Sequence, residues 1–455
     1  MIVGFDYGSA NCAVGKLVGD QVELLPLSAN SPYVSSTLYA YDRELIALAV
    51  YQGLEASQQA EYARLRSAQL TRARQALVEL DLSANEQLVF FGDEAVEQYL
   101  DFPEEGFYVR SPKSFLGASG LRQEQVALFE DIVTVMMMHI KNAAEKITKQ
   151  ALTQAVIGRP VNFQGVAAEE ANLQAEAILT TAAKRAGFAQ VAFLFEPIAA
   201  GMDYEASLTE DKTVLVVDIG GGTTDCSVVK MGPSHIGSQD RSADFLGHTG
   251  QRVGGNDLDI ALAMHGFMPS LGLGSAMKNG LPVPSKPFWN AVAVNDVSAQ
   301  RDFSSLASRK LIEDLVKDAQ SPALINRLLK VQKQQLGYQL VRSAEQTKIA
   351  LSNAATTTVD LNYIETALST QITEPQFEQA ISDPINRVES LMAGVLEQTQ
   401  VTPDIIYVTG GTARSPVIHQ KITAMFPDKP VVVGDHFGSV TAGLARWAKR
   451  IFTHA

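Results

Sequence analysis

The sequence predicts an α/β protein built from two similar lobes around a shared cleft. A strand–turn–strand segment near the N-terminus returns near the middle of the chain, at 3–15 and 215–230. Strand and helix patterns alternate between these two segments, as they do in α/β domains. The length of 455 residues is enough for two such units. A duplicated unit is therefore the simplest organisation for the chain.

The repeat is visible in the residue types and in their order. The first segment reads VGFDYGSANCAVG and the second reads LVVDIGGGTTDCSVVK. Each is an apolar strand, an aspartate, a glycine turn and a second apolar strand, a pattern typical of β-hairpins. Two such segments can also resemble each other by chance. A two-residue gap at the glycines pairs Asp6 with Asp218, Ser9 with Thr223, Asn11 with Asp225, and Cys12 with Cys226.

Four elements are predicted between the two hairpins. Apolar residues recur three and four apart over 126–144, which predicts an amphipathic helix whose methionines lie in the core. The segments 153–160 and 190–197 are typical of strands that end at a proline. Between them, 168–186 is predicted to be a helix that stops at Gly187. This alternation supports an α/β lobe.

The second half of the chain is predicted to hold one irregular segment and several helices. Residues 266–287 are rich in glycine and proline, so we expect either a disordered insert, which we favour, or an ordered binding loop. Helical periodicity returns over 305–352. A strand, a glycine turn and a helix start follow at 404–418, and a terminal helix follows at 440–452.

The composition excludes several classes of protein. Hydrophobic residues make up 46% of the chain and charged residues 19%, which excludes a wholly disordered protein. The 37 basic and 50 acidic residues give a net charge of −13, which disfavours binding to nucleic acid or to an anionic membrane. The N-terminus lacks the basic region of a signal peptide, and no apolar run reaches the roughly 18 residues of a membrane helix. We therefore expect a soluble, cytoplasmic protein.

The cysteines and histidines exclude further classes. Cys12 and Cys226 are the only cysteines, so neither a disulfide framework nor a four-cysteine zinc site is available. They lie on predicted strands of opposite lobes, and we expect two unbonded core thiols. The histidines show no HExxH spacing and the chain has no GxSxG, which argues against a zinc protease and a serine hydrolase.

The glycine turns indicate phosphate binding. A turn of glycine with serine or threonine lets backbone amides approach phosphate oxygens without an intervening Cβ. The GGGTTD turn at 220–225 fits this description and lacks the lysine of a P-loop. Taken alone, Asp6 and Asp218 are each typical turn residues. As a pair facing one cleft, they suit Mg²⁺ held through its water shell.

A third glycine turn, TGGTAR at 409–414, follows a predicted strand. Its glycines are explained either by close packing at the strand–helix junction or by a backbone that lies flat against a nucleoside. Glu345 and Lys348 lie three residues apart on a predicted helix. Taken alone, they predict only an exposed ion pair worth about 0.2–0.5 kcal/mol.

Together these motifs resemble the ATPase domain of DnaK-type heat-shock chaperones, within the actin-like ATPase superfamily. Seven segments occur in the family's order from residue 2 to about residue 450: FDYGSAN, IGRP, FEPIAAG, VDIGGGTTD, GGNDLD, RSAEQTKIALS and TGGTARSP. Singly these motifs are weak, but their order and spacing are specific. The segments 111–121, 154–165 and 437–448 resemble most closely the YegD group of chaperone-like proteins.

The resemblance implies the actin-like ATPase fold. That fold has two ribonuclease-H-like lobes, each with an inserted subdomain, and a nucleotide cleft between them. The implied boundaries are lobe I at 1–209, with core segments of about 1–30 and 122–209 around an insert at 31–121, and lobe II at 210–455, with core segments of about 210–253 and 376–455 around an insert at 254–375.

The resemblance also implies a site for ATP or ADP with Mg²⁺, and K⁺ as a further ion. By this resemblance, the family's catalytic residues align with Lys113, Glu196, Asp218 and Asp225. The family's metal-side aspartates align with Asp6 and Asp218. Its nucleotide-binding group falls on Gly8, Ser9, Ala10, Asn11, Gly220, Gly221, Gly222, Thr223, Thr224, Gly254, Gly255, Glu345, Lys348, Ser352, Gly410, Gly411 and Arg414.

This set suits in-line attack of water on a γ-phosphate. Phosphoryl transfer depends on positioning and charge neutralisation more than on covalent help from the protein. Lys113 would neutralise developing charge and hold the water. Glu196 and Asp218 would orient the water and the Mg²⁺ shell, and the sequence does not assign the proton acceptor.

The chain departs from the family pattern at several positions. Ala10 stands where the family has a second hydroxyl, which puts the rate in doubt, and Ile349 stands where it has an arginine beside adenine. Glu176 stands where the family has a basic residue that couples lobe motion to the interdomain linker. The chain ends after the ATPase domain, so we expect no linker and no substrate-binding domain. The stretch 256–340 is longer than in the family.

We expect a slow, Mg²⁺-dependent ATPase of chaperone type whose output is lobe closure on ATP. Its expected partners are ATP and protein clients or co-chaperones of unknown identity, with no nucleic acid and no membrane. Two alternatives on the same fold stay open. One is a small-molecule kinase, with Asp225 or Glu196 as base, and the other is an actin-like scaffold or filament protein.

Overall fold

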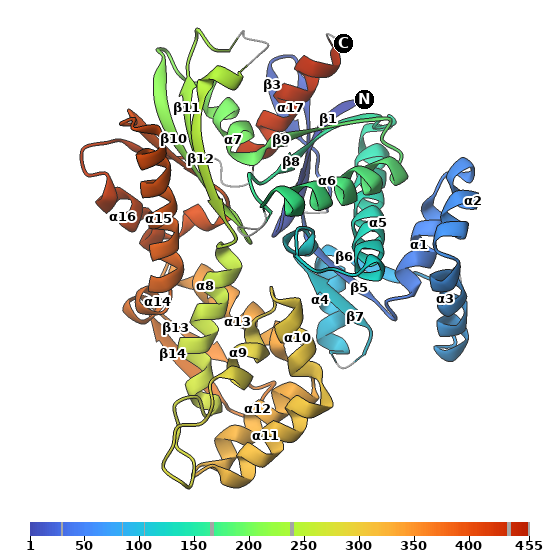
Figure 1. The fold of residues 1–455 in the computed structure, drawn as a ribbon, viewed down its shortest axis with the longest axis vertical. Helices are drawn as coiled ribbons and strands as arrows, with labels where there is room; N and C mark the ends of the chain where they lie inside the picture. Colours follow the sequence, from blue (N-terminus) through green and yellow to red (C-terminus); the bar gives the residue numbers. More distant parts are fainter. Residues whose placement is uncertain are drawn as a thin grey trace.

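The protein has two lobes that each enclose a central β-sheet, with further helices extending from one end (Figure 1). The structure is a computed structural model. It describes residues 1–28, 31–83, 85–103, 105–163, 168–236, 241–434 and 438–453.

The first sheet has the strand order β3–β2–β1–β8–β9, and β4 pairs with β2. Its strands are β1 (Ile2–Tyr7), β2 (Asn11–Val18), β3 (Gln21–Leu24), β4 (Tyr33–Ser35), β8 (Gln154–Arg159) and β9 (Gln190–Phe195). The first three strands pair antiparallel, and β1, β8 and β9 pair parallel.

The second sheet repeats this topology, in the order β12–β11–β10–β15–β16. Its strands are β10 (Lys212–Ile219), β11 (Thr224–Met231), β12 (Phe245–Gln251), β15 (Ile405–Thr409) and β16 (Val431–Val433). Three antiparallel strands are again followed by two parallel ones. The two-lobe α/β architecture predicted from the repeat is therefore confirmed, while the boundaries of its subdomains stay a prediction.

Both predicted hairpins are present, but their predicted alignment is wrong. Asp6 pairs with Ala13 in the first hairpin, and Asp218 pairs with Asp225 in the second. The two turns therefore have equal length and no gap is needed. Cys12 then corresponds to Thr224, two positions before Cys226. Both cysteines are buried and unbonded, as expected.

Helices cover both faces of the two sheets. The outer helices are α5 (Gln123–Thr148) and α6 (Ala168–Arg185) on the first sheet, and α14 (Glu374–Ala380), α15 (Ser382–Thr399) and α16 (Pro416–Met425) around the second. Two helices lie between the sheets, α7 (Glu196–Glu205) and the terminal α17 (Gly438–Thr453). α17 packs so closely on the first sheet that a Cβ at Gly4 would collide with the backbone of Ala445. The end of the chain thereby joins the two lobes.

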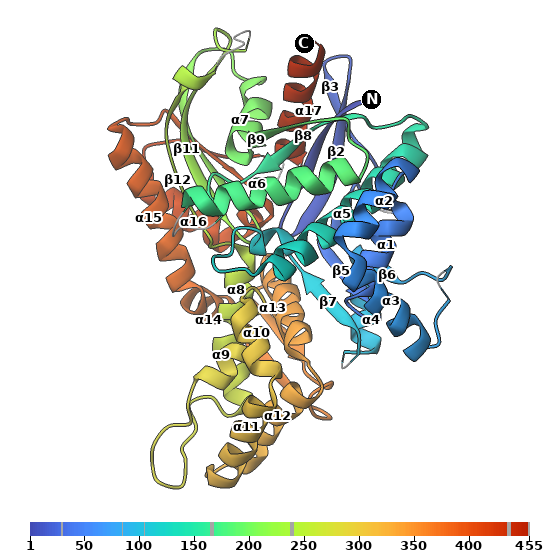
Figure 2. The same ribbon diagram turned by 45° about the vertical axis from the view of Figure 1, so that its right-hand side comes forward.

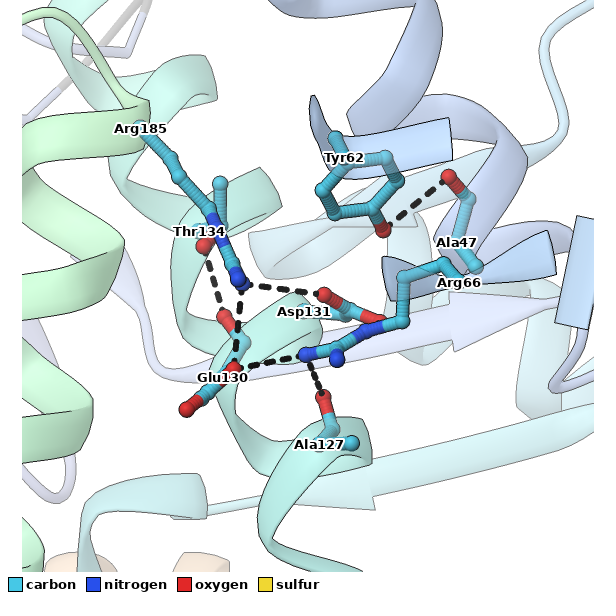
Figure 3. A network of polar contacts seen from close by, with 8 residues as sticks. All are labelled: Ala47, Tyr62, Arg66, Ala127, Glu130, Asp131, Thr134 and Arg185. Atoms are coloured by element: carbon cyan, nitrogen blue, oxygen red, sulfur yellow. Dashed lines mark hydrogen bonds and ion pairs between the residues drawn. The ribbon is translucent and has the colours of Figure 1, made fainter. Parts of the chain in front are cut away.

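Lobe I carries a small sheet and four helices between its two core segments. They are β5 (Thr37–Ala40), β6 (Val89–Phe91), β7 (Phe107–Arg110), α1 (Leu45–Gly53), α2 (Ala56–Leu65), α3 (Ser67–Glu79) and α4 (Gly92–Asp101). Figures 1 and 2 place α1–α3 on the outer side of this lobe. Arg66 attaches these helices to α5 through buried contacts with Glu130 and Asp131, at 2.6 and 2.8 Å (Figure 3).

Lobe II carries a larger helical insert. It contains α8 (Gly255–Leu262), α9 (Lys286–Val292), α10 (Val297–Ser304), α11 (Leu306–Asp318), α12 (Pro322–Lys333), α13 (Gly337–Leu351) and the hairpin of β13 (Thr356–Asp360) with β14 (Ser369–Thr373). The favoured prediction of a disordered insert at 266–287 is wrong. Phe267, Met268 and Leu271 are fully buried in the core, which gives this irregular segment apolar anchors.

The other predicted elements are present with small shifts at their ends. α5, β8, α6, β15 and α17 match the predicted segments. The strand predicted over 190–197 stops at Phe195, and Glu196 is the first residue of α7, with Pro197 in its first turn. Among the described residues, no helix combines the length and apolar composition that a membrane span requires.

Candidate functional site

The two glycine turns of the hairpins touch each other across the lobes. A Cβ built on Gly221 would lie 2.8 Å from the Cβ of Ala10, closer than two carbon atoms approach. A Cβ on Gly222 would lie 3.3 Å from the Oγ of Ser9. The contact explains why glycine is needed here and brings the turns together where a single phosphate chain could meet both.

A cleft of about 920 Å³ opens above the two turns. That volume is near the upper end of the about 300–1,000 Å³ usual for small-molecule sites. Most of the predicted site residues line it: Asp6, Gly8, Ser9, Ala10, Asn11, Glu196, Asp218, Gly220, Gly221, Thr223, Gly255, Glu345, Lys348, Ser352, Gly410, Gly411 and Arg414. Residues from both halves of the chain, more than 400 positions apart, are thus brought into one cavity.

The third glycine turn packs directly on the floor of the cleft. Gly410 follows β15 and has a φ of 88°, a left-handed conformation that glycine adopts without strain. A Cβ at this position would lie 2.7 Å from the Oδ1 of Asp218 and would collide with the carbonyl of Ile219. The glycine therefore meets a close approach as well as a conformational need.

Carboxyl groups crowd the floor of the cleft. Asp218 is buried there and Asp6 is partly buried, and burial together with the charge of Glu196 raises the pKa of Asp6 to about 7 and that of Asp218 to about 8. Asp225 stands behind them, where burial holds its pKa well above the usual range while its Oδ1 accepts a hydrogen bond of 3.0 Å from the Val161 amide. This accumulation of unfavourable negative charge would be relieved by a cation.

Lys113 supplies a positive charge beside this cluster. Its side chain is 3% exposed, and its Nζ pairs with Glu196 and donates to the carbonyl of Gly158 at 3.2 Å. Burial opposes the charge on the lysine, but the carboxylates of Glu196 and Asp6 overcome it, so the pKa of Lys113 is raised. The amine is therefore held charged behind Glu196, next to the cavity wall.

The remaining predicted residues support the cleft without lining it. Gly254 fits against the carbonyl oxygens of Gly220 and Gly221, where a Cβ would lie within 2.9 Å of the backbone. Thr224 donates its hydroxyl to the carbonyl of Val253 at 2.8 Å. Gly222, Asp225 and Lys113 likewise lie behind the cavity surface. These side chains shape the turns.

Glu345 and Lys348 both line the cleft, but they do not pair with each other. Glu345 pairs with Arg110 of the opposite lobe at 2.9 Å, and Lys348 pairs with the buried Asp259 at 2.7 Å. The expectation of an exposed ion pair between them is therefore wrong, because each finds a partner on another element. Burial raises the pKa of Asp259 to about 6, although Lys348 opposes the shift.

Several lining residues were not predicted. They are Tyr33, Asn256, Asp259, Asn353, Thr412, Ala413, Ser415, Pro416, His419, Gln420, Val433 and Val440. Asn256 and Asp259 lie in the motif GGNDLD, so their motif already indicated the site. His419 and Gln420 lie on α16, one turn beyond the third glycine turn, where nothing in the sequence distinguishes them from other helix residues.

Two positions noted as departures have clear surroundings. Ile349 lines the cleft from α13 and is 58% exposed, so its apolar side chain borders the open end of the cavity. Glu176, on α6, pairs with Arg159 at the end of β8. The guanidinium of Arg159 also lies 4.9 Å from the ring centroid of Phe195, directly before Glu196.

Comparison with known proteins identifies the family. The family model described as Hsp70 protein matches residues 119–268 and 308–447, more than half of the chain. The chain belongs to the Hsp70 family. Its actin-like ATPase fold follows from this assignment, whereas the assignment to the YegD group stays a prediction. The matched ranges leave out residues 1–118 and 269–307, which include α1–α4 and most of the irregular segment.

Three curated relatives show how distant the similarity is. The chain is 24% identical over 392 residues to the chaperone protein DnaK of Guillardia theta, covering 82% of this chain and 51% of that protein. It is 25% identical over 357 residues to DnaK of Mycoplasmoides gallisepticum, covering 75% and 49%. It is 26% identical over 333 residues to DnaK of Gracilaria tenuistipitata var. liui, covering 69% and 42%. The chain spans about half or less of the length of these relatives.

Proposed function

We propose that this protein is a chaperone-type ATPase that binds ATP and ADP with Mg²⁺, hydrolyses ATP slowly and changes the opening of its lobes as it does so. The observation that carries the proposal is the pair of matched hairpin turns that meet across one cleft above buried carboxylates. The curated relatives that the chain resembles are chaperones, and clients or co-chaperones would be its protein partners.

The donor set fits a hydrated Mg²⁺ ion. Asp6 and Asp218 line the cleft, and burial together with the charge of Glu196 raises the pKa of both carboxyls. Within the described ranges, no group of three or more acidic, histidine or cysteine side chains is arranged to hold a metal directly. Mg²⁺ keeps most of its water ligands and takes only one or two carboxylates. Asp6 and Asp218 would hold its water shell, and the ion would supply charge neutralisation for the phosphates; K⁺ would be a second ion.

Different residues of the cleft would hold the phosphates, the attacking water and the nucleoside. The amides of 8–11 and 221–223 would hold phosphate oxygens, since glycine leaves these turns open, whereas the amide of Gly220 donates to the carbonyl of Thr223 at 2.9 Å. Lys113 would neutralise charge at the γ-phosphate, and Glu196, already paired with it, would orient the attacking water. Gly410, Gly411 and Arg414 would border the nucleoside.

Calorimetric titration with Mg²⁺–ATP and Mg²⁺–ADP tests the binding part of the proposal, and absence of affinity for both would refute it. Turnover that rises only when a small-molecule acceptor is added would favour the kinase alternative. Nucleotide-dependent light scattering would favour a filament.

We expect Lys113→Ala to lower the single-turnover hydrolysis rate by about 100-fold or more, because it removes a fixed charge at the reacting phosphate. Affinity for Mg²⁺–ADP should be retained. The matched control is Lys333→Ala, which removes a lysine paired with Glu313 on the distal insert. Equal turnover in the Lys113→Ala protein and the wild type would show that the lysine has no role in hydrolysis.

A further inference from the structure

Lys113 lies in a short segment of lobe I that contacts lobe II on both sides of the lysine. The segment is a single 3₁₀ turn, Pro112–Phe115, which directly follows β7. Lys113 pairs with Glu196 and donates a hydrogen bond to the carbonyl of Gly158, both in lobe I. The residues just before and after it contact lobe II instead. The position of the lysine therefore depends on both lobes.

The first contact with lobe II is at Ser111. The side-chain amide of Asn256 donates a hydrogen bond of 3.2 Å to the Oγ of Ser111, and both residues are almost fully buried. Ser111 has φ 54° and ψ 51°, a left-handed conformation that costs a serine roughly 1 kcal/mol. A strained residue directly before the turn persists because its surroundings hold it there. Asn256 is part of that support.

The second contact with lobe II is at Phe115. The guanidinium of Arg252 lies 5.8 Å from the ring centroid of Phe115, within the range of a cation–π contact. Arg252 is fixed within lobe II, since its side chain donates to the carbonyl of Asn295 and its own carbonyl accepts from Arg387 at 2.9 Å. Phe115 is 6% exposed, so the ring cannot turn away without leaving the core.

The contact at Ser111 connects, through Asn256, to the glycine turn of lobe II. The amide of Asn256 donates to the carbonyl of Gly221 at 2.7 Å, and the amide of Gly255 donates to the carbonyl of Gly220 at 2.9 Å. On the other side, a Cβ on Gly222 would lie 2.5 Å from the Oγ of Ser114, so the turn presses against the residue after the lysine. A continuous set of contacts thus runs from the 220–222 turn to the segment that carries Lys113.

We propose that Arg252 and Asn256 are positioning residues that hold the Lys113 segment in its hydrolytic position only when the two lobes are closed. Opening of the cleft separates Arg252 from Phe115 and Asn256 from Ser111, so the turn is released and the lysine loses its fixed place. Hydrolysis is thereby restricted to the closed state. This inference rests on the proposed ATPase function and adds a mechanism by which lobe II controls a lobe I side chain.

The test separates positioning from ordinary packing. Arg252→Met keeps length and apolar packing but removes the charge over the ring. Loss of a cation–π contact predicts a fall in the hydrolysis rate of about two- to tenfold, with the affinity for Mg²⁺–ADP unchanged. Arg252→Lys restores a cation and should recover most of the rate. The matched control, Arg327→Met, removes a lobe II arginine that pairs with Glu365 at 2.8 Å, and it should leave the rate unchanged.

A double-mutant cycle checks that Arg252 acts through Phe115. Phe115→Leu alone should lower the rate as Arg252→Met does, and the double variant should be no slower than either, because both remove the same contact. The proposal would be overturned if the losses of the two single variants added in the double variant, or if the single variants kept the wild-type rate. It would also be overturned if the rate and the nucleotide affinity fell together and Arg252→Lys did not restore them.

A second variant tests the contact at Ser111 with a substitution that the backbone conformation favours. Ser111→Gly removes the acceptor of the Asn256 amide, while glycine suits the left-handed backbone at this position. It should lower the hydrolysis rate with affinity retained, and an unchanged rate would contradict the role of Asn256. If the wild type hydrolyses ATP and these variants hydrolyse it at the same rate, only the positioning role is refuted. A wild-type protein without turnover refutes the proposed function and this inference together.

Discussion

The acidic groups on the cleft floor make the nucleotide-free protein sensitive to pH. Asp218 has a pKa of about 8 in the folded chain, against an ordinary value of 3.8, because it is buried next to other carboxylates. Between these two values the folded state holds a proton that the unfolded state releases. The unfolding free energy therefore decreases as the pH rises from about 4 to about 8.

We expect Asp218→Asn to raise the stability of the nucleotide-free protein at pH 8.5, because the amide replaces a charge that burial disfavours. At pH 5.5 the folded carboxyl is protonated while the unfolded one has largely released its proton, so the gain should be smaller than at pH 8.5 and should vanish near pH 4. Denaturant unfolding at the two pH values measures the difference. Asp314→Asn, at an exposed position, is the control. A gain that is the same at both pH values would contradict the assigned pKa shift.

The open end of the cleft offers a second residue-scale prediction. Ile349 is exposed there and presents no charge or flat group to a base. We expect Ile349→Arg to tighten Mg²⁺–ADP binding about two- to fivefold, because a guanidinium stacks on an aromatic base. Competition binding with ADP and CDP measures the gain. Ile349→Gln adds a polar side chain without the charge, and an equal gain in that variant would show that the guanidinium is not the cause.

At the scale of elements, the helices α1–α3 are joined to lobe I by buried ion pairs. Arg66 and Arg185 approach Glu130 and Asp131 from two sides, and the Tyr62 ring lies against both guanidinium groups, as Figure 3 shows in part. Burial raises the pKa of Asp131 although Arg66 opposes the shift. The attachment therefore depends on charge pairing in a place that water does not reach.

We expect Arg66→Met to destabilise this attachment by about 3 kcal/mol, because it leaves a buried carboxylate with half of its partners. Hydrogen exchange of the α2 and α3 amides measures the local effect. Adding Asp131→Asn to Arg66→Met should restore part of the loss, since the unpaired charge is then removed. Lys317→Met, which breaks an exposed pair with Asp314, should leave exchange unchanged. A double variant no better than Arg66→Met would argue against charge as the cause.

The elements also show what sequence patterns can and cannot predict. The hairpins, α5, β8, α6 and α17 follow from apolar periodicity and from glycine or proline at their ends, which are local signals. The two-residue gap in the repeat was wrong because matching cysteines is a similarity of letters, whereas strand register depends on pairing. The segment 266–287 was judged by its glycines and prolines, but these indicate irregular backbone, and burial of Phe267 and Leu271 decides order.

The site shows the same division. Most of the residues predicted from motif order line one cleft, because glycine turns and their aspartates are contiguous in the sequence. Partners from other elements were not predictable: Arg110 meets Glu345 and Arg252 meets Phe115 only after the lobes assemble, and Asp259 meets Lys348 only after the insert of lobe II folds. Their sequence separations exceed any local pattern. The crossing of α17 onto the first sheet belongs to the same class.

At the scale of the whole molecule, the helices inserted in the two lobes contact each other beside the cleft. The Oη of Tyr99 on α4 donates a hydrogen bond of 2.6 Å to the carbonyl of Gln335, beside α13. The rings of Tyr99 and Tyr108 lie 5.7 and 4.9 Å from that of Tyr338. With the ion pair of Arg110 and Glu345, these contacts form a bridge between the lobes beside the cleft, which Glu345 lines.

We expect Tyr99→Phe to speed the release of Mg²⁺–ADP about three- to tenfold, because it removes one bridging hydrogen bond and keeps the ring packing. The hydrogen bond exists only in the closed state, so its removal favours opening of the cleft. The rate of ADP release should therefore change more than the rate at which bound ATP is hydrolysed. Stopped-flow displacement of a fluorescent ADP analogue measures it. Tyr363→Phe is the matched control, since it removes a tyrosine hydroxyl that contacts Ser343 of α13 within lobe II alone, at 3.1 Å. If both variants release ADP at the wild-type rate, the bridge does not govern opening, and the motion that admits nucleotide must occur elsewhere between the lobes.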